Sequence, residues 1–185
     1  MNQLSSISIP NILTILRILL TPLFLIVLLR HNYPQALLIF VLAGISDALD
    51  GFIARYFNQR TLLGAYLDPV ADKLLLVSAF VALAVLEVIP SWVAILVIAR
   101  DVIIFLGIAI FTVTDKTYII RPSIVSKFTT TAQILLIILV LFDPLRMKVA
   151  LLHAPMLWVA ALLTIVSGLH YIYVGMSILQ EPNAE

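Results

Sequence analysis

Four aspartates fall between positions 47 and 72 of an otherwise strongly apolar sequence. Each lies inside or at the edge of a segment that is apolar enough to cross a membrane. An ionised carboxylate at the centre of a membrane helix costs about 2.5–3.5 kcal/mol on the insertion scale, so four of them need a compensating partner. They are Asp47, Asp50, Asp68 and Asp72. What neutralises these four charges is the main functional question that the sequence raises.

The composition is that of an integral membrane protein. Of the 185 residues, 63% are hydrophobic and 11% are charged, whereas soluble domains carry about 25% charged residues. There is no basic run, so we expect no nucleic-acid partner. Cysteine is absent, which excludes disulfides, thiolate nucleophiles and Cys-based metal sites. The three histidines are scattered along the sequence and form no ligand cluster, so a metal ion would be held by oxygen. The length fits a single domain, residues 1–185.

Six apolar segments are long enough to span a bilayer, which needs about 20 mainly apolar residues. Polar or turn-forming residues separate them. The residues before the first segment lack the charged region and cleavage site of a signal peptide, so we expect that segment to be retained. The expected fold is all-α, a membrane bundle of six transmembrane helices. They cover residues 11–30, 35–57, 65–88, 91–113, 124–142 and 156–179.

The positions of Lys and Arg in the connections and near the segment ends predict the orientation, because the cytoplasmic side is enriched in both. With the N-terminus inside, the cytoplasmic side carries more of them than the opposite side. We therefore expect the acidic hairpin to face the cytoplasm, in the inner membrane of a bacterium. The cytoplasmic residues are Arg55, Arg60, Lys116, Arg121 and Lys127, and the opposite ones are Arg30, Arg146 and Lys148.

The spacing of the aspartates predicts that they converge. Asp47 and Asp50 are at positions i and i+3, and Asp68 and Asp72 are at i and i+4, so each pair shares one face of its helix. A short connection makes the two helices antiparallel neighbours. Four carboxylates at one point need counter-charge. Two divalent cations would supply it, and carboxylates suit Mg²⁺, Mn²⁺ or Ca²⁺.

Two other interpretations of the acidic residues stay open. The first is that they form packing ion pairs with Arg55 and Lys73, although two bases leave two of the four acids unbalanced. The second is a cation or proton pathway, which also uses carboxylates inside membranes. A membrane transporter with an acidic site is therefore the rival from another functional class.

The aspartates belong to a pattern that resembles the signature of the CDP-alcohol phosphotransferase family. From Asp47 to Asp72 it reads Asp-x₂-Asp-Gly-x₂-Ala-Arg-x₈-Gly-x₃-Asp-x₃-Asp, and every signature position is filled. The resemblance implies that the four aspartates hold two divalent cations, Mg²⁺ or Mn²⁺. It also implies that Asp72 acts as general base toward the acceptor hydroxyl. The residues that it assigns to the CDP part of the donor are Gly51, Ala54, Arg55 and Thr61.

The first segment opens with polar residues at every third position: Asn11, Thr14 and Arg17. This spacing places them on one helix face. Similar Asn-x-x-Thr-x-x-Arg runs occur in the family, and by that resemblance Asn11 and Thr14 would contact the diphosphate of the donor. The alternative is an ordinary helix start, with the Arg17 side chain extended along the apolar surface to the membrane interface.

Three basic residues outside the signature are candidates for binding a phosphate on the acceptor: Arg100, Arg121 and Lys127. Arg100 is followed by Asp101 in the fourth segment. Adjacent residues point about 100° apart on a helix, so these two need not pair, and a structural ion pair with another helix is an equal alternative. For the other two, the alternative is a positively charged cytoplasmic flank.

The resemblance also implies the reaction: transfer of a phosphatidyl group from CDP-diacylglycerol to a glycerol-type alcohol, with release of CMP. Two branches share the Leu-Asp-Pro-x-Ala-Asp-Lys run around Asp68. Phosphatidylglycerophosphate synthases use glycerol 3-phosphate, and CDP-alcohol-type cardiolipin synthases use phosphatidylglycerol. The pair Arg100-Asp101 departs from the Arg-Glu usual in the first branch, whereas the compact chain fits it. We expect glycerol 3-phosphate, with phosphatidylglycerol as the alternative, and a homodimer in the lipid bilayer.

Overall fold

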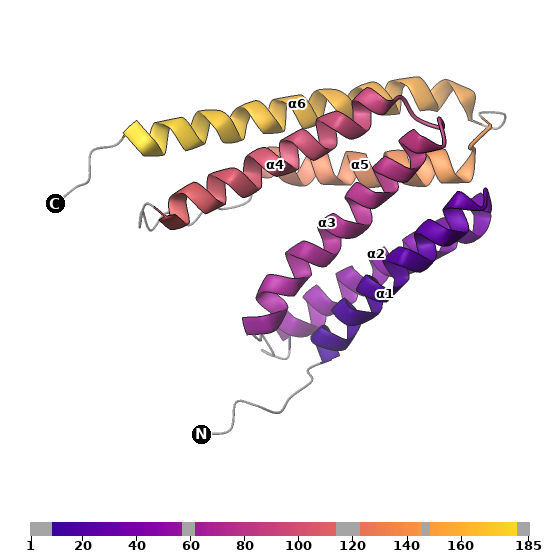
Figure 1. The fold of residues 1–185 in the computed structure, drawn as a ribbon, viewed down its shortest axis with the longest axis horizontal. Coiled ribbons are helices and arrows are strands. Elements are labelled where there is room, and N and C mark those ends of the chain that lie inside the picture. The colour runs from indigo at the N-terminus through magenta and orange to yellow at the C-terminus, as the bar shows by residue number, and fades with distance from the viewer. Residues whose placement is uncertain (1–8, 57–61, 114–122, 146–148, 181–185) are drawn as a thin grey trace. The chain divides into compact units, whose positions relative to one another are not determined.

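The computed structural model describes residues 9–56, 62–113, 123–145 and 149–180. Within these ranges the chain forms six α-helices and no strand, which confirms the all-α prediction (Figure 1). Their bounds agree closely with the predicted segments, except that the last helix begins at residue 150 rather than 156. The helices are α1 (Ile9–Leu29), α2 (Tyr33–Tyr56), α3 (Leu62–Val85), α4 (Ser91–Val113), α5 (Ile124–Phe142) and α6 (Ala150–Gln180).

The helices group into two compact units, Met1–Val88 and Ile89–Glu185. In the first unit, α1 packs against both α2 and α3. In the second unit, α4 and α5 each pack against α6. The expectation that residues 1–185 form a single domain stays a prediction.

The buried face of α1 changes in character along its length. Its buried residues recur alternately three and four positions apart, which is the spacing of one helix face. The first three are polar and the last two are apolar: Thr14, Arg17, Thr21, Phe24 and Leu28. The apolar part of the face packs against α2, where the ring of Phe24 lies 5.6 Å from that of Phe40. The N-terminal half of α1 therefore brings polar groups into the interior of the first unit.

Helices α1 and α3 end in the same way. His31 and Glu87 each adopt the left-handed conformation, with φ of 57°. The amides that follow each helix turn back onto its last carbonyls, which is the hydrogen-bond pattern of a Schellman ending. After α1, the N–H groups of His31 and Asn32 donate to the carbonyls of Leu28 (2.9 Å) and Val27 (3.2 Å). After α3, the N–H groups of Glu87 and Val88 donate to the carbonyls of Ala84 (3.1 Å) and Leu83 (3.0 Å).

The early start of α6 follows from contacts around Asp143, the C-cap residue of α5. Its carboxylate accepts a hydrogen bond from the backbone N–H of Val149 at 2.7 Å. His153 Nε2 lies 3.8 Å from the same oxygen. These contacts hold the first turn of α6 against the end of α5. Pro155 then lies inside the helix, where its missing N–H removes one backbone hydrogen bond without ending the helix.

Two helices among the described residues are long and apolar enough to cross a bilayer, judged by length and composition. They cover Ile124–Phe142 and Leu151–Ser177. Three shorter apolar stretches occur at Leu13–Leu29, Tyr33–Asp47 and Lys73–Val85. The six-helix prediction is therefore confirmed as a count of helices in the described residues, and the crossing of a membrane by all six stays a prediction.

The left-handed conformation of Glu87 leads to a stability prediction. A residue with a Cβ atom pays about 1–2 kcal/mol in this conformation, whereas glycine does not. Glu87→Gly should therefore raise the thermal unfolding temperature of the detergent-solubilised protein. Glu87→Ala is the matched control, because it removes the same charge and keeps the Cβ atom. An equal rise in both variants would show that the charge, not the backbone, is the cause.

Candidate functional site

The four signature aspartates lie on the consecutive helices α2 and α3, at similar distances along each helix from the connection that joins them. Asp50 lies as far before the end of α2 at Tyr56 as Asp68 lies beyond the start of α3 at Leu62, about 9 Å in each case at 1.5 Å per residue. Figure 1 shows α2 and α3 running in opposite directions beside α1. The backbones of all four residues are described, but of their side chains only that of Asp47 is. The convergence of the four carboxylates stays a prediction.

Asp47 forms an ion pair with Arg17 of α1. Arg17 Nη2 lies 3.0 Å from Asp47 Oδ1. The arginine side chain is 1% exposed, whereas that of Asp47 is 44% exposed. The alternative in which Arg17 extends to the membrane interface is therefore wrong. The sequence identified Arg17 as part of a polar helix face but did not identify Asp47 as its partner.

The polar face of α1 points into the first unit. Thr14, Arg17 and Thr21 are all buried, and the Thr21 hydroxyl donates a hydrogen bond to the Arg17 carbonyl at 3.0 Å. Asn11, predicted with Thr14 to contact the donor, lies in the first turn of α1, and its side chain is outside the described set. The structure therefore places Thr14 in the interior beside Arg17, and its contact with a donor stays a prediction.

Three further predicted donor contacts lie near the C-terminal end of α2. Gly51, Ala54 and Arg55 belong to its last two turns, and only their backbones are described. Thr61 lies outside the described residues. The helical backbone from Asp47 to Arg55 keeps the spacing on which the signature depends.

The predicted ligand set fits hard divalent cations in its chemistry. All four ligands are carboxylates, which Mg²⁺ and Mn²⁺ prefer. The Asp47 side chain remains partly exposed although it pairs with Arg17. Among the side chains that the structure describes, no three from His, Cys, Asp and Glu gather as a metal site. Three of the four predicted ligands lie outside that set.

A comparison with family models decides the assignment of the chain. The model described as CDP-alcohol phosphatidyltransferase matches residues 7–166. The chain belongs to this family. The matched residues include α1 to α5 and about half of α6, together with all four aspartates. The resemblance inferred from the signature is thereby confirmed.

The relatives of this chain include proteins named cardiolipin synthase and proteins named CDP-diacylglycerol–glycerol-3-phosphate 3-phosphatidyltransferase. The human cardiolipin synthase (CMP-forming) is 32% identical over 94% of this chain and 63% of its own length. The CDP-diacylglycerol–glycerol-3-phosphate 3-phosphatidyltransferase of Bacillus subtilis is 31% identical over 95% of this chain and 99% of its own. The Shigella flexneri protein of that name is 37% identical over 89% and 93%. The chain thus spans less than two thirds of the human relative.

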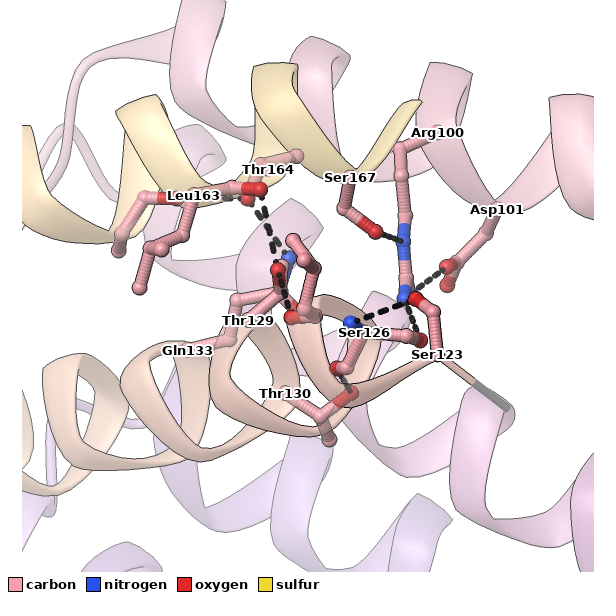
Figure 2. Close-up of polar contacts among 12 residues, drawn as sticks. Arg100, Asp101, Ser123, Ser126, Thr129, Thr130, Gln133, Leu163, Thr164 and Ser167 are labelled. Atoms are coloured by element: carbon pink, nitrogen blue, oxygen red, sulfur yellow. Dashed lines mark hydrogen bonds and ion pairs between the residues drawn. The ribbon is translucent and has the colours of Figure 1, made fainter. Parts of the chain in front are cut away.

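In the second unit, Arg100 joins α4 to α5 and α6 (Figure 2). Its side chain is 3% exposed, and all three guanidinium nitrogens have partners. Nη1 pairs with Asp101 Oδ1 at 2.7 Å, Nε donates to the Ser167 hydroxyl at 3.4 Å, and Nη2 donates to the Ser126 hydroxyl. Arg100 and Asp101, which are adjacent on α4, therefore do pair. Arg100 has the contacts of a residue that holds three helices together.

A second set of hydrogen bonds joins α5 to α6. The Thr129 hydroxyl contacts the carbonyls of Val125 and Leu163, at 2.8 and 3.0 Å. Gln133 Nε2 donates to the Thr164 hydroxyl at 3.0 Å, and that hydroxyl donates to the Ala160 carbonyl. Figure 2 shows Thr129, Gln133 and Thr164 beside the Arg100 contacts. Together the two sets form a buried polar seam within the second unit.

Of the other two acceptor candidates, Lys127 is the one that the structure describes. Lys127 lies in the first turn of α5 and is exposed, and its backbone N–H donates to the Ser123 carbonyl at 3.2 Å. Ser123 caps this helix by accepting a hydrogen bond from the Ser126 N–H. Arg121 lies outside the described residues. Of the described candidates, Lys127 is the one whose side chain is accessible to a ligand.

The sequence interpretation missed most of the polar seam. The sequence does contain a pattern that indicates it, namely polar residues at helical spacing within apolar segments. Ser126, Thr129 and Gln133 share one face of α5, and Thr164 and Ser167 share one face of α6. Hydroxyl and amide side chains on such faces commonly join helices in membranes. Which helix each face meets depends on tertiary packing.

The buried Arg100–Asp101 pair predicts non-additive stability effects. Arg100→Met leaves the buried Asp101 carboxylate without this partner and should lower the free energy of unfolding by about 3–5 kcal/mol. The double variant Arg100→Met/Asp101→Leu removes both charges and should be more stable than the single variant. Equilibrium unfolding of the detergent-solubilised proteins measures the free energy of unfolding of the single and the double variant. A double variant no more stable than the single one would contradict this account of the pair.

Proposed function

We propose that this protein transfers a phosphatidyl group from CDP-diacylglycerol to a glycerol-type alcohol and releases CMP. The observation that supports it most is the complete signature from Asp47 to Asp72 inside the family match of residues 7–166. The names of the bacterial relatives, which this chain spans almost completely, state a reaction of this kind.

Each signature residue has a role in the proposed reaction. Two divalent cations, Mg²⁺ or Mn²⁺, bound by the four aspartates would neutralise charge on the diphosphate and make CMP a better leaving group. Asp72 accepts the proton of the acceptor hydroxyl. The acceptor oxygen then bonds to the phosphorus that carries the diacylglycerol, and the bond from that phosphorus to the CMP oxygen breaks. Gly51 and Ala54 are small enough to let the cytidine part approach α2, and Arg55 supplies positive charge.

Glycerol 3-phosphate is the acceptor that we propose first. The chain spans 99% and 93% of two relatives whose names state this acceptor, but 63% of the human cardiolipin synthase. Phosphatidylglycerol is the second candidate, because the human relative aligns with 94% of this chain. Lys127 and Arg121 are the proposed contacts for a phosphate on either acceptor. Arg100 contributes to such a contact only if it leaves its three present partners.

The proposed location is the lipid bilayer of a bacterial inner membrane, with the acidic residues toward the cytoplasm. Large apolar side chains are exposed along the helices of both units, which suits a lipid environment. Examples are Leu19 on α1, Leu38 on α2, Val85 on α3, Ile95 on α4, Phe128 on α5 and Leu151 on α6. A homodimer, expected from the family resemblance, is part of the same proposal.

The proposal is tested by CMP release from the purified protein supplied with CDP-diacylglycerol and Mg²⁺ or Mn²⁺. Glycerol 3-phosphate should support release, and chelation of the metal should abolish it. Asp72→Asn should abolish turnover, because it removes the proposed base. Glu87→Gln, a carboxylate change on the exposed turn after α3, is the matched control and should keep full turnover.

The other outcomes separate the remaining hypotheses. Release with phosphatidylglycerol and not with glycerol 3-phosphate would assign the second acceptor. No release with either alcohol, together with cation flux into proteoliposomes, would favour the transporter and overturn the proposed function.

A further inference from the structure

Arg17 is a described cation that contacts a signature aspartate, and neither the signature nor the proposed reaction uses it. It contacts Asp47 Oδ1 at 3.0 Å. Asp47 is the first of the four proposed metal ligands, so Arg17 acts directly on the proposed site. The pair joins α1 to α2, and α1 also packs against α3, which carries Asp68 and Asp72.

The burial of Arg17 separates this contact from an ordinary surface ion pair. Exposed pairs contribute about 0–1 kcal/mol and exchange freely with water. Here the guanidinium is 1% exposed and is enclosed on the inward face of α1 together with Thr14 and Thr21. A cation enclosed in this way cannot turn to solvent, so it holds the Asp47 carboxylate in one orientation.

The exposure of Asp47 is complementary to the burial of Arg17. The carboxylate receives the arginine from the interior, and yet the Asp47 side chain as a whole is 44% exposed. One side of Asp47 is thus fixed by protein, and another remains open to a ligand. Partners that hydrogen-bond to a metal-binding carboxylate fix its orientation in this manner, and their loss typically reduces metal affinity or activity about 10–100-fold.

We propose that Arg17 is a positioning residue for metal binding, which orients Asp47 from its buried side. The inference rests on the proposed function, because it takes Asp47 as a metal ligand. It assigns Arg17 to the carboxylate rather than to the diphosphate of the donor. Removing Arg17 should therefore weaken metal binding even when donor and acceptor are both absent.

The test is a titration of the purified full-length protein with Mn²⁺, followed by the EPR signal of free Mn²⁺, without any substrate. Arg17→Met should bind Mn²⁺ about 10–100-fold more weakly than wild type. Arg17→Lys keeps the charge without the shape of the guanidinium and should lie between wild type and Asp47→Asn. Arg30→Met removes an exposed arginine just beyond α1 and should bind as wild type does.

A double variant shows whether Arg17 acts through Asp47. Adding Arg17→Met to Asp47→Asn should produce no further loss of Mn²⁺ affinity beyond that of Asp47→Asn alone. A purely structural role of Arg17 predicts a further loss instead. If Arg17→Met does not fold, Arg17→Lys decides, and an affinity equal to that of wild type overturns the inference.

Failure of the inference and failure of the proposed function give different results. If Asp47→Asn weakens Mn²⁺ binding and Arg17→Met binds as tightly as wild type, or more tightly, the inference is wrong and the metal site stands. If wild type binds no Mn²⁺, or Asp47→Asn leaves binding unchanged, the proposed metal site is wrong and the inference is overturned with it.

Discussion

Ionised groups inside apolar helices require partners on the same or neighbouring helices, and this constraint organises both units of the chain. In the first unit, the enclosed guanidinium of Arg17 is matched by Asp47 on α2. In the second, Arg100 is matched by Asp101 and by hydroxyls from α5 and α6. The two arginines differ in consequence. Arg100 has an ionic partner that is itself buried, which suits a structural tie, whereas Arg17 holds a carboxylate that is still open to a ligand.

The difference between these pairs bears on how the acidic residues are neutralised. Asp47 does have a protein cation beside it, but that cation is Arg17, whereas the packing interpretation named Arg55 and Lys73. One described pair leaves the other signature aspartates to be accounted for, and their uniform carboxylate chemistry suits divalent cations. The match to the CDP-alcohol phosphatidyltransferase family covers all four of the signature aspartates. An ion pair and a metal site are therefore compatible at Asp47.

Much of the fold could be predicted from the sequence, because continuous apolar segments separated by polar residues specify helices directly. The start of α6 could not, because it depends on the contact between Asp143 and the Val149 amide across the connection. The helix faces carrying Thr14, Arg17 and the aspartates were predictable from spacing. Their pairing was not, because it depends on how α1 packs against α2. The acceptor is also undetermined by the sequence, since a basic residue such as Lys127 suits any phosphate.

The central claim is that the four aspartates of α2 and α3 hold two divalent cations together. Low-temperature EPR of the Mn²⁺-loaded protein tests it most directly, because two ions about 3.5–4 Å apart in a shared site give a magnetically coupled spectrum. The account predicts two coupled Mn²⁺ ions per chain, with the coupling lost in Asp68→Asn. A single isolated ion, or a coupled spectrum that persists in Asp68→Asn, would contradict it.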